Sequence, residues 1–244
     1  MFNYLFKFFG INFSNELILN YEKVKFNSDI IYKKKYIYTV NNYSNELFDI
    51  NTKSTFEIYS LYTRFQKKIH SLLFETYDVA PDLYILKPGK LKREYFKTLS
   101  SCAINFDTGE SKEILFQVLS GSGYFLLENI VDRKQVKFIK VKKNDIILIP
   151  KNWAFIMINN NLCKNFIAIC LRNRSVKIKN NIFEDMGGAF VFYTINGFIK
   201  NKNTSPYYHL DEYSGDYLED YQFNKNIGIY DEFIKFPEKF NFLK

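Results

Sequence analysis

Histidine and cysteine are scarce in this sequence, which has two His and three Cys among 244 residues. The cysteines (Cys102, Cys163 and Cys170) are odd in number and show no CxxC spacing, which argues against a disulfide framework or a zinc knuckle. Free cysteines fit a reducing compartment, so we expect the cytoplasm or, alternatively, an organelle matrix. The histidines, His70 and His209, are not spaced as a ligand pair, and we expect both to be structural or solvent-exposed.

Glycine, proline and long apolar runs are also rare. With 10 Gly and 5 Pro, long flexible linkers are not expected. No stretch approaches the ~20 apolar residues of a transmembrane helix. The apolar opening MFNYLFKFFGINF has one basic residue and no following cleavage site, so it is a poor signal peptide. We expect it to pack on the body of the protein, with attachment to a membrane surface or a partner as the alternative.

Several catalytic motifs are absent. The sequence has no phosphate-binding loop, no dinucleotide-binding glycine pattern, no GxSxG and no HExxH. The GSG at 121–123 is expected to be a hairpin turn. These absences exclude the enzyme classes that depend on those motifs.

Charge is present but uneven. The net charge is +8, and residues 211–220 contain five acidic residues and no basic one, so the rest of the chain carries +13. Basic clusters of this kind attract phosphates or RNA. In the longest cluster, however, Val136, Phe138 and Val141 interleave with lysines as in a strand with one solvated face. A solvated sheet face and a surface for a protein or RNA partner both remain open. The basic clusters are residues 33–35, 134–143 and 172–179.

Hydrophobic periodicity predicts one helix followed by many strands. In residues 63–77, Phe65, Ile69, Leu72 and Leu73 are spaced to form one apolar helical face. Short apolar runs separated by turns then predict an antiparallel sandwich or barrel. After an acidic loop, a short helix is expected to end before Pro237. The predicted strands are 83–86, 93–98, 113–119, 123–129, 136–141, 145–150, 154–159, 166–171, 188–195 and 197–200.

Five motifs follow one another along the chain, and each is similar to a segment of one known family. DLYILKPGKLKREYFKT resembles D-I-T-V-I-P-P-G…G-x-E-x-x-K-T. EILFQVLSGSGYFLL resembles E-I-Y-E-V-L-x-G-x-G-x-x-L-L, and IPKNWAF with Asn159 resembles V-P-P-x-W-A-H…N. EDMGGAFVFYTINGFIKNKNTSPYY resembles a closing G-G-x…N-G…N-P-x-Y segment, and IYDEFIKFPEKFNFL resembles the tail of bacterial members. In this order the five motifs resemble the cupin-type glucose-6-phosphate isomerases of archaea and some bacteria.

This resemblance implies an all-β fold, a cupin double-stranded β-helix (jelly-roll) barrel. The barrel would have an N-terminal extension that contains a helix and a short C-terminal helical tail. We expect one domain over residues 1–244, with the extension at 1–80, the barrel core at 81–200 and the tail at 201–244. The resemblance also implies a homodimer.

The family's chemistry is the interconversion of an aldose and a ketose phosphate at a divalent metal, with a carboxylate as base. The metal ligands are three histidines and a glutamate, and all four are replaced here. Glu113 precedes one of these positions and would take the catalytic role only through a β-bulge, because a one-residue shift turns a strand side chain to the opposite face. The ligand positions fall on Ser101, Ala103, Ile114 and Phe155.

The phosphate-binding side of the family's site is reduced as well. Tyr84 replaces a threonine, while Lys97 and Thr98 match the family's K-T. These two are either a phosphate contact or an ordinary pair at the end of a strand. Trp153 is expected to be a packing anchor.

We therefore expect a degenerate family member that lacks a metal, a cofactor and catalysis and is retained as a binding or structural protein. The first alternative is an active glucose-6-phosphate/fructose-6-phosphate isomerase of glycolysis and gluconeogenesis with a non-standard site. The second is a basic subunit of a nucleoprotein or organellar assembly.

Overall fold

The structure, a computed structural model, describes residues 11–15, 22–43, 45–49, 54–204, 209–218, 221–225 and 227–244. Most of the apolar N-terminal opening lies outside these residues, and the prediction that it packs on the body lies outside them too.

One of the two large sheets has ten strands. Its main path runs β19-β18-β9-β15-β12-β13-β20, and β8, β10 and β17 join at its sides. Nearly all of its pairings are antiparallel, whereas β20 runs parallel to β13. The strands are β8 (Lys90–Leu91), β9 (Glu94–Lys97), β10 (Ser101–Ile104), β12 (Ser122–Asn129), β13 (Gln135–Lys142), β15 (Trp153–Asn159), β17 (Lys177–Asn180), β18 (Val191–Thr194), β19 (Gly197–Lys200) and β20 (His209–Ser214).

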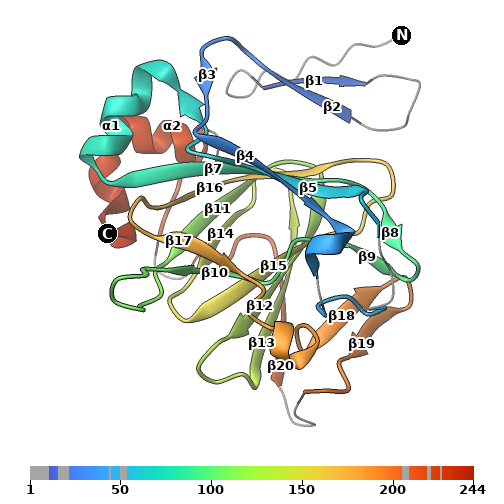
Figure 1. The fold of residues 1–244 in the computed structure, drawn as a ribbon. Helices are drawn as coiled ribbons and strands as arrows, with labels where there is room; N and C mark the ends of the chain where they lie inside the picture. Colours follow the sequence, from blue (N-terminus) through green and yellow to red (C-terminus); the bar gives the residue numbers. More distant parts are fainter. Residues whose placement is uncertain are drawn as a thin grey trace.

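The other large sheet has six strands in the order β14-β11-β16-β7-β5-β4. It curls over the ten-stranded sheet to form a barrel, as Figure 1 shows. The all-β cupin fold expected from the sequence is confirmed. The strands are β4 (Lys34–Thr39), β5 (Glu57–Thr63), β7 (Val79–Leu86), β11 (Ile114–Ser120), β14 (Ile146–Ile149) and β16 (Phe166–Asn173).

The helices and the two small sheets lie outside the barrel. The two α-helices described, α1 and α2, lie together against the outer face of the six-stranded sheet (Figure 1), where Phe74 and Phe233 stack with ring centroids 4.6 Å apart. The short strands are β1 (Ile11–Asn15) with β2 (Glu22–Phe26), and β3 (Ile30–Ile31) with β6 (Gln66–Lys67). The helices are α1 (Ser71–Thr76) and α2 (Gly228–Lys235), and the 3-10 helices are η1 (Val40–Tyr43), η2 (Lys68–His70), η3 (Glu184–Met186) and η4 (Pro237–Leu243).

Strand alternation assigns each side chain to the barrel interior or to an outer layer. On β11, Ile114, Phe116 and Val118 belong to the interior cluster, whereas Leu115 and Leu119 pack outward against the helices. Interior side chains from both sheets fill one continuous apolar core.

The predicted helix over 63–77 is wrong in extent. Residues up to Thr63 form β5, residues 66–67 pair with β3, and only Ser71–Thr76 are α-helical. Ile69 and Leu72, expected on a buried face, are 81% and 74% exposed. The backbone N–H of Phe65 donates to Pro81 O at 2.7 Å, so tertiary strand pairing overrides the helical periodicity here.

Segments from both flanks complete the barrel sheets. From the predicted extension, β4 and β5 continue the six-stranded sheet beyond β7. From the predicted acidic loop, residues 209–214 form β20 and pair with β13, so part of that segment is a strand rather than a loop. The division of residues 1–244 at 80 and 200 therefore crosses hydrogen-bonded sheets, and a single domain remains our proposal.

Candidate functional site in the barrel interior

Two of the predicted ligand positions face each other across neighbouring strands. Ser101 on β10 pairs directly with Phe155 on β15. Ala103 lies two residues further along β10 and therefore on the same face. The fold brings these three positions together at one end of the barrel.

Apolar side chains fill the space between these positions. Phe155 is fully buried, and Ala103 and Ile114 are each 1% exposed within the same core cluster. The Phe155 ring lies 5.1 Å from the Phe116 ring and 6.3 Å from the Tyr84 ring, between ring centroids. Aromatic side chains thus close the interior around position 155.

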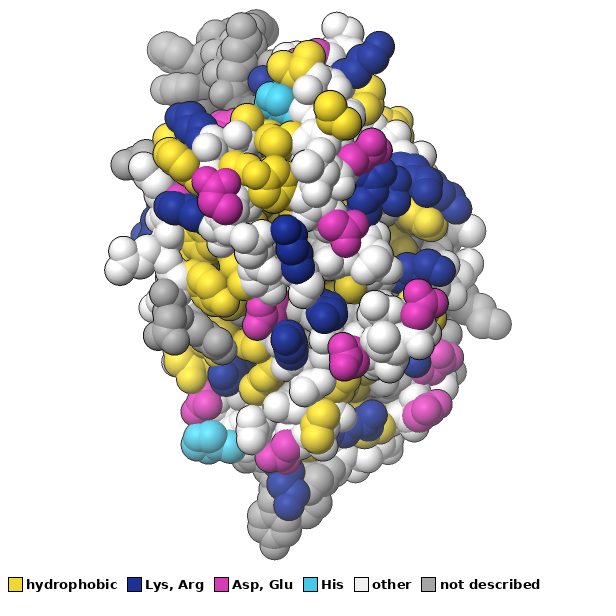
Figure 2. Space-filling view, turned by 90° about the vertical axis from the view of Figure 1, so that its left-hand side faces the viewer, with side chains coloured by type: hydrophobic (Ala, Val, Ile, Leu, Met, Phe, Trp, Pro, Cys, Tyr) yellow, Lys and Arg dark blue, Asp and Glu magenta, His cyan; other side chains and the backbone are white. Residues whose placement is uncertain are grey.

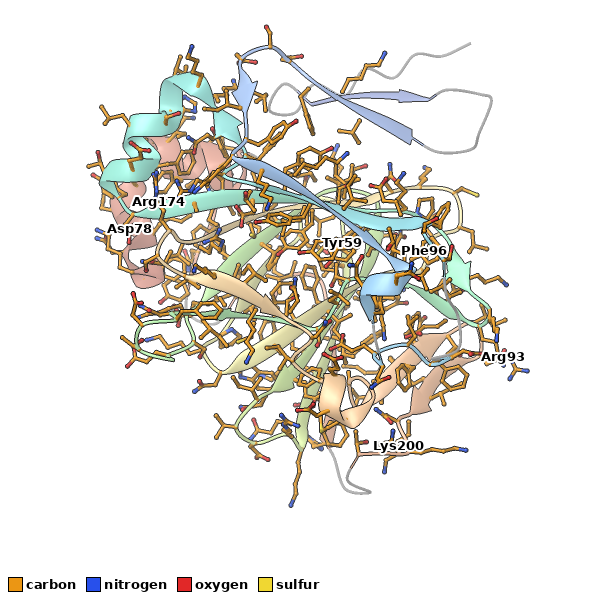
Figure 3. The ribbon with its side chains drawn as sticks, in the orientation of Figure 1. Tyr59, Asp78, Arg93, Phe96, Arg174 and Lys200 are labelled. Carbon is orange, nitrogen blue, oxygen red and sulfur yellow. The ribbon has the colours of Figure 1, made fainter. Side chains whose placement is uncertain are left out.

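Ser101, the polar member of the set, is occupied by its neighbours. Its hydroxyl lies 2.8 Å from Asn180 Oδ1 and 3.0 Å from Leu99 O, both acceptors. The Asn180 amide in turn donates to the Tyr38 hydroxyl at 3.0 Å. Tyr38 stacks on Tyr59, whose place between the sheets is visible in Figure 3, with ring centroids 4.2 Å apart. This chain of contacts links β10 to β17 and β4.

Glu113, the predicted catalytic residue, immediately precedes β11 and is half-buried. A register irregularity does occur in β11, between Val118 and Ser120. Even with this irregularity, Ile114 holds the position that faces the interior at the start of β11. The assignment of Glu113 as a catalytic base remains a prediction.

A buried ion pair lies next to these positions. Arg172 on β16 pairs with Ile114 on β11, and its Nε donates to Asp82 Oδ2 at 2.7 Å. Asp82 is fully buried and also accepts from the Arg64 backbone N–H at 2.8 Å. Burial lowers the pKa of Arg172, but the charge and hydrogen bond of Asp82 more than offset this, and the pKa lies above its ordinary value. The barrel therefore holds a permanent cation beside position 114.

The neighbouring groups on the same face are uncharged. Tyr84 and Cys170 flank Asp82, and burial raises the pKa of each well above its ordinary value. Among the described residues, the buried Tyr84 hydroxyl has no hydrogen-bond partner. It is the one orphaned polar atom in the aromatic group around Phe155.

Lys97 and Thr98, the predicted phosphate contacts, are buried and engaged with protein groups. The Lys97 amine lies 2.6 Å from Glu94 Oε1, donates to Glu46 O at 2.7 Å and sits 4.8 Å from the centre of the Phe192 ring. Thr98 Oγ1 accepts from the Met157 backbone N–H at 3.0 Å. A phosphate would have to displace these partners, so their role as phosphate contacts remains a prediction.

Glu46 was not identified from the sequence, although its buried carboxylate connects Ser100 and Phe183 through hydrogen bonds. Its carboxylate accepts from the Ser100 backbone N–H at 2.9 Å, from the Ser100 hydroxyl and from the Phe183 N–H at 3.3 Å. Burial raises the pKa of Glu46, and the two hydrogen bonds from Ser100 oppose that shift. Glu46 lies in an irregular segment without periodicity, so no local sequence signal identifies it.

Comparison with known proteins assigns the chain to a family. The family model described as Glucose-6-phosphate isomerase (GPI) matches residues 31–209. The chain belongs to the glucose-6-phosphate isomerase family. The resemblance inferred from the five sequence motifs is confirmed.

The solved structures similar to this chain have low sequence identity to it. Vicilin from Corylus avellana (hazelnut) is 13% identical with a TM-score of 0.39, over 63% of this chain and 37% of that one. Vicilin from Capsicum annuum is 12% identical with a TM-score of 0.38, over 50% and 30%. Salicylate 1,2-dioxygenase from Pseudoaminobacter salicylatoxidans, as its adducts with gentisate, is 13% identical with a TM-score of 0.30, over 42% and 24%. The chain thus spans less than two fifths of each of these proteins, and no curated protein matches it.

The residues at the predicted metal position do not fit a divalent cation. The hydroxyl of Ser101 is one weak oxygen donor, and the apolar side chains of Ala103, Ile114 and Phe155 offer none, whereas the expected ligands are imidazole nitrogens and a carboxylate. Within the described ranges, no group of three or more His, Cys, Asp or Glu is arranged to hold a metal ion. His70 lies 3.1 Å from the Tyr230 hydroxyl, and His209 lies 2.9 Å from Asp211 Oδ1. Both histidines therefore lie in the structural and surface settings expected for them.

Two remaining sequence predictions concern packing and membranes. Trp153, predicted as a packing anchor, is 7% exposed in the interior cluster, with the Lys137 amine 4.6 Å from its ring centre. In the part of the chain that the structure describes, no helix is long and apolar enough to cross a membrane.

Proposed function

We propose that this member of the glucose-6-phosphate isomerase family lacks the metal and the isomerase activity and is retained as a binding or structural protein. The observation that carries the proposal is the apolar filling of the ligand positions, with Phe155 fully buried between Phe116 and Tyr84. Protein interiors are close-packed, so an ion and its substrate would need this aromatic group to move apart.

The Arg172 cation supports the same proposal. It lies directly across the strand pair from Ile114, the position of the family's glutamate ligand. The Asp82 carboxylate, which would otherwise attract a cation, is already neutralised by this guanidinium, with Arg172 Nε 2.7 Å from Asp82 Oδ2. Arg172 with Asp82 therefore balances charge inside the barrel without an ion.

We further propose that the protein folds as one domain, forms a homodimer and works in a reducing compartment, the cytoplasm or an organelle matrix. All three cysteines are free, and Cys102 and Cys170 are buried. The homodimer is proposed from the family resemblance alone. The molar mass of the protein in solution, measured by light scattering, tests it.

A coupled assay for the interconversion of glucose 6-phosphate and fructose 6-phosphate tests the function. The protein is purified without chelators and assayed with added Mn²⁺, Fe²⁺ or Zn²⁺, alongside elemental analysis of the same sample. We expect no turnover above a blank that lacks protein. Turnover that depends on one of these metals would contradict the proposal and restore the active isomerase as the better account.

A further inference from the structure

A pocket of about 480 Å³ lies outside the barrel, on the outer face of the ten-stranded sheet. Small-molecule sites typically occupy about 300–1,000 Å³, so its size suits a ligand of a few rings. It is separate from the ligand positions 101, 103, 114 and 155. Its main lining side chains are Tyr124, Phe138, Lys140, Tyr193, Phe198 and Glu212.

Cross-strand pairs build the pocket. Tyr124 on β12 is paired with Lys140 on β13, and Tyr193 on β18 is paired with Phe198 on β19. Phe138 follows the outward alternation of β13, two residues before Lys140. Paired residues share a face of the sheet, so the strand register itself places these side chains on one surface.

Aromatic rings form the wall of the pocket. Tyr124 and Phe138 are stacked with ring centroids 4.5 Å apart, and Phe198 meets Phe138 edge-on at 4.3 Å. Tyr193 lies 5.1 Å from Phe198 and its hydroxyl donates to the Tyr124 hydroxyl at 3.3 Å. Tyr124, Tyr193 and Phe198 are only half-buried, so ring surface remains open to a ligand.

Two opposite charges stand at the rim. Lys140 is exposed, and Glu212 on β20 is exposed and paired with Phe138 across the parallel strands. Lys142 is also exposed and lies on the same face as Lys140, two residues further along β13. Burial and the Tyr124 hydroxyl raise the pKa of Tyr193 to about 12, so this phenol stays neutral beside the lysine near pH 7.

We propose that this pocket binds a nucleotide, with the base against the aromatic wall and the phosphate at Lys140. Every base has a π-face, and stacking on aromatic side chains beside a basic group is the general way in which proteins bind unpaired nucleotides. The carboxylate of Glu212 is suited to accept a hydrogen bond from a base amino group or a ribose hydroxyl. A purely apolar ligand would leave Lys140 and Glu212 without a role.

The nucleotide is either free or part of a single-stranded RNA, and both present the same chemistry to the pocket. The net charge of +8 favours an anionic ligand in either form. On the face shown in Figure 2, most of the described Lys and Arg side chains are interspersed with Asp and Glu. Specific recognition would therefore depend on the pocket and not on the overall charge.

Calorimetric titration of the full chain with AMP, adenosine, ribose 5-phosphate and inorganic phosphate tests the proposal. We expect AMP to bind more tightly than each of the three fragments, because it alone combines base and phosphate. Removal of a stacking ring should weaken binding by about 5- to 150-fold, the usual effect of one base–aromatic contact. Phe198→Ala and Lys140→Ala are the test variants, since both side chains reach solvent.

Lys177→Ala is the matched control, because Lys177 is another exposed strand lysine beside an aromatic ring, 5.1 Å from the centre of Phe106. It should leave AMP affinity unchanged. If Phe198→Ala fails to fold by circular dichroism, Lys140→Ala and the adenosine titration still decide the question.

A short single-stranded RNA that binds more tightly than AMP, with a strong salt dependence, would assign the site to RNA, and equal affinity would assign it to free nucleotide. Absence of AMP binding at millimolar concentration, AMP affinity no better than that of ribose 5-phosphate, or AMP affinity unaffected by Lys140→Ala would overturn the proposal, independently of the isomerase assay.

Discussion

Ser101 and Phe155 lie directly opposite each other across β10 and β15, and both are positions that the motif resemblance predicts to match metal-binding histidines. The two replacements are therefore neighbours in space, although 54 positions separate the residue numbers in the sequence. Ser101 is held by Asn180, and Phe155 is held by the interior rings. Phe155, at the predicted metal position, is part of the packed core.

The first prediction concerns Phe155 as a core residue. Phe155→Ala should lower the free energy of unfolding by about 3–5 kcal/mol, because a buried phenyl ring is removed and the cavity can collapse only in part. Urea denaturation followed by circular dichroism measures the change. Phe106→Ala, at a ring that is 57% exposed, is the control and should change stability by about 0.5 kcal/mol or less. If Phe155→Ala lowered the free energy of unfolding as little as Phe106→Ala does, the barrel interior would be loosely packed.

The second prediction concerns the Asp82–Arg172 pair. Asp82→Asn or Arg172→Met alone should each cost about 3–5 kcal/mol, because each leaves a buried charge without its partner. The double variant should cost clearly less than the sum of the two, and a double-mutant cycle in urea measures that coupling. The Arg174–Glu75 pair, 2.6 Å between Nη2 and Oε1, is the control, because its side chains are 21% and 53% exposed.

Figure 3 places the Arg174 control at the α1 side of the barrel. Glu75→Gln should cost no more than about 1 kcal/mol, since exposed ion pairs contribute little. Additive effects of the Asp82 and Arg172 changes would mean that the buried charges do not depend on each other.

The third prediction concerns Glu128, which is 1% exposed on the outer face of β12. Burial raises its pKa from 4.5 to about 8; the hydrogen bond from the Phe190 N–H and the charge of Arg133 oppose the shift, whereas Glu46 adds to it. The folded state therefore holds a proton that the unfolded state releases above pH 4.5. The contribution of protonated Glu128 to the free energy of unfolding is complete below about pH 4.5 and is lost as the pH rises towards 8.

Glu128→Gln tests this prediction, because glutamine keeps an oxygen for the Phe190 N–H and cannot ionise. Urea midpoints measured from pH 5 to pH 9 should fall with pH in the wild type and fall less in the variant. Glu110→Gln is the control, since that side chain is 68% exposed. Parallel curves for the wild type and Glu128→Gln would refute the assignment.

The fourth prediction concerns the single domain. Since β5 and β20 from the two flanks are hydrogen-bonded to β7 and β13, the flanks and the barrel should unfold together. Thermal unfolding should give one transition, at the same temperature by tryptophan fluorescence from Trp153 and by far-ultraviolet circular dichroism. Two separated transitions would instead divide the chain near residue 80 or 200.

The barrel strands were predictable because each one combines a buried face with a clear turn. The apolar runs around Leu115, Phe125 and Ile156 alternate or are uniformly apolar, and each became a strand. The observed structure of residues 63–77 was not predictable, because the pairing of residues 66–67 with β3 depends on a segment over thirty residues earlier. Strand β20 was not predicted because its acidic side chains are typical of a loop. They also suit an edge strand exposed to solvent.

The four predicted ligand positions could be proposed from the sequence because each lies at a fixed distance from a recognisable motif. The groups that surround them could not. In the sequence, Arg172 belongs to a basic cluster. Only the register of β16 with β11, which pairs Arg172 with Ile114, shows that it lies inside the barrel. Glu46 and Tyr38 come from the N-terminal extension, and only the tertiary fold brings them to Ser100 and Asn180.

We propose above all that the barrel holds no catalytic metal. Equilibrium dialysis of the purified protein against Mn²⁺, Fe²⁺ and Zn²⁺ in turn, followed by elemental analysis, tests it most directly. The account predicts far less than one equivalent of each metal per chain after a wash with metal-free buffer, and no change between the wild type and Ser101→Ala. One equivalent of a retained metal, reduced by Ser101→Ala, would contradict it.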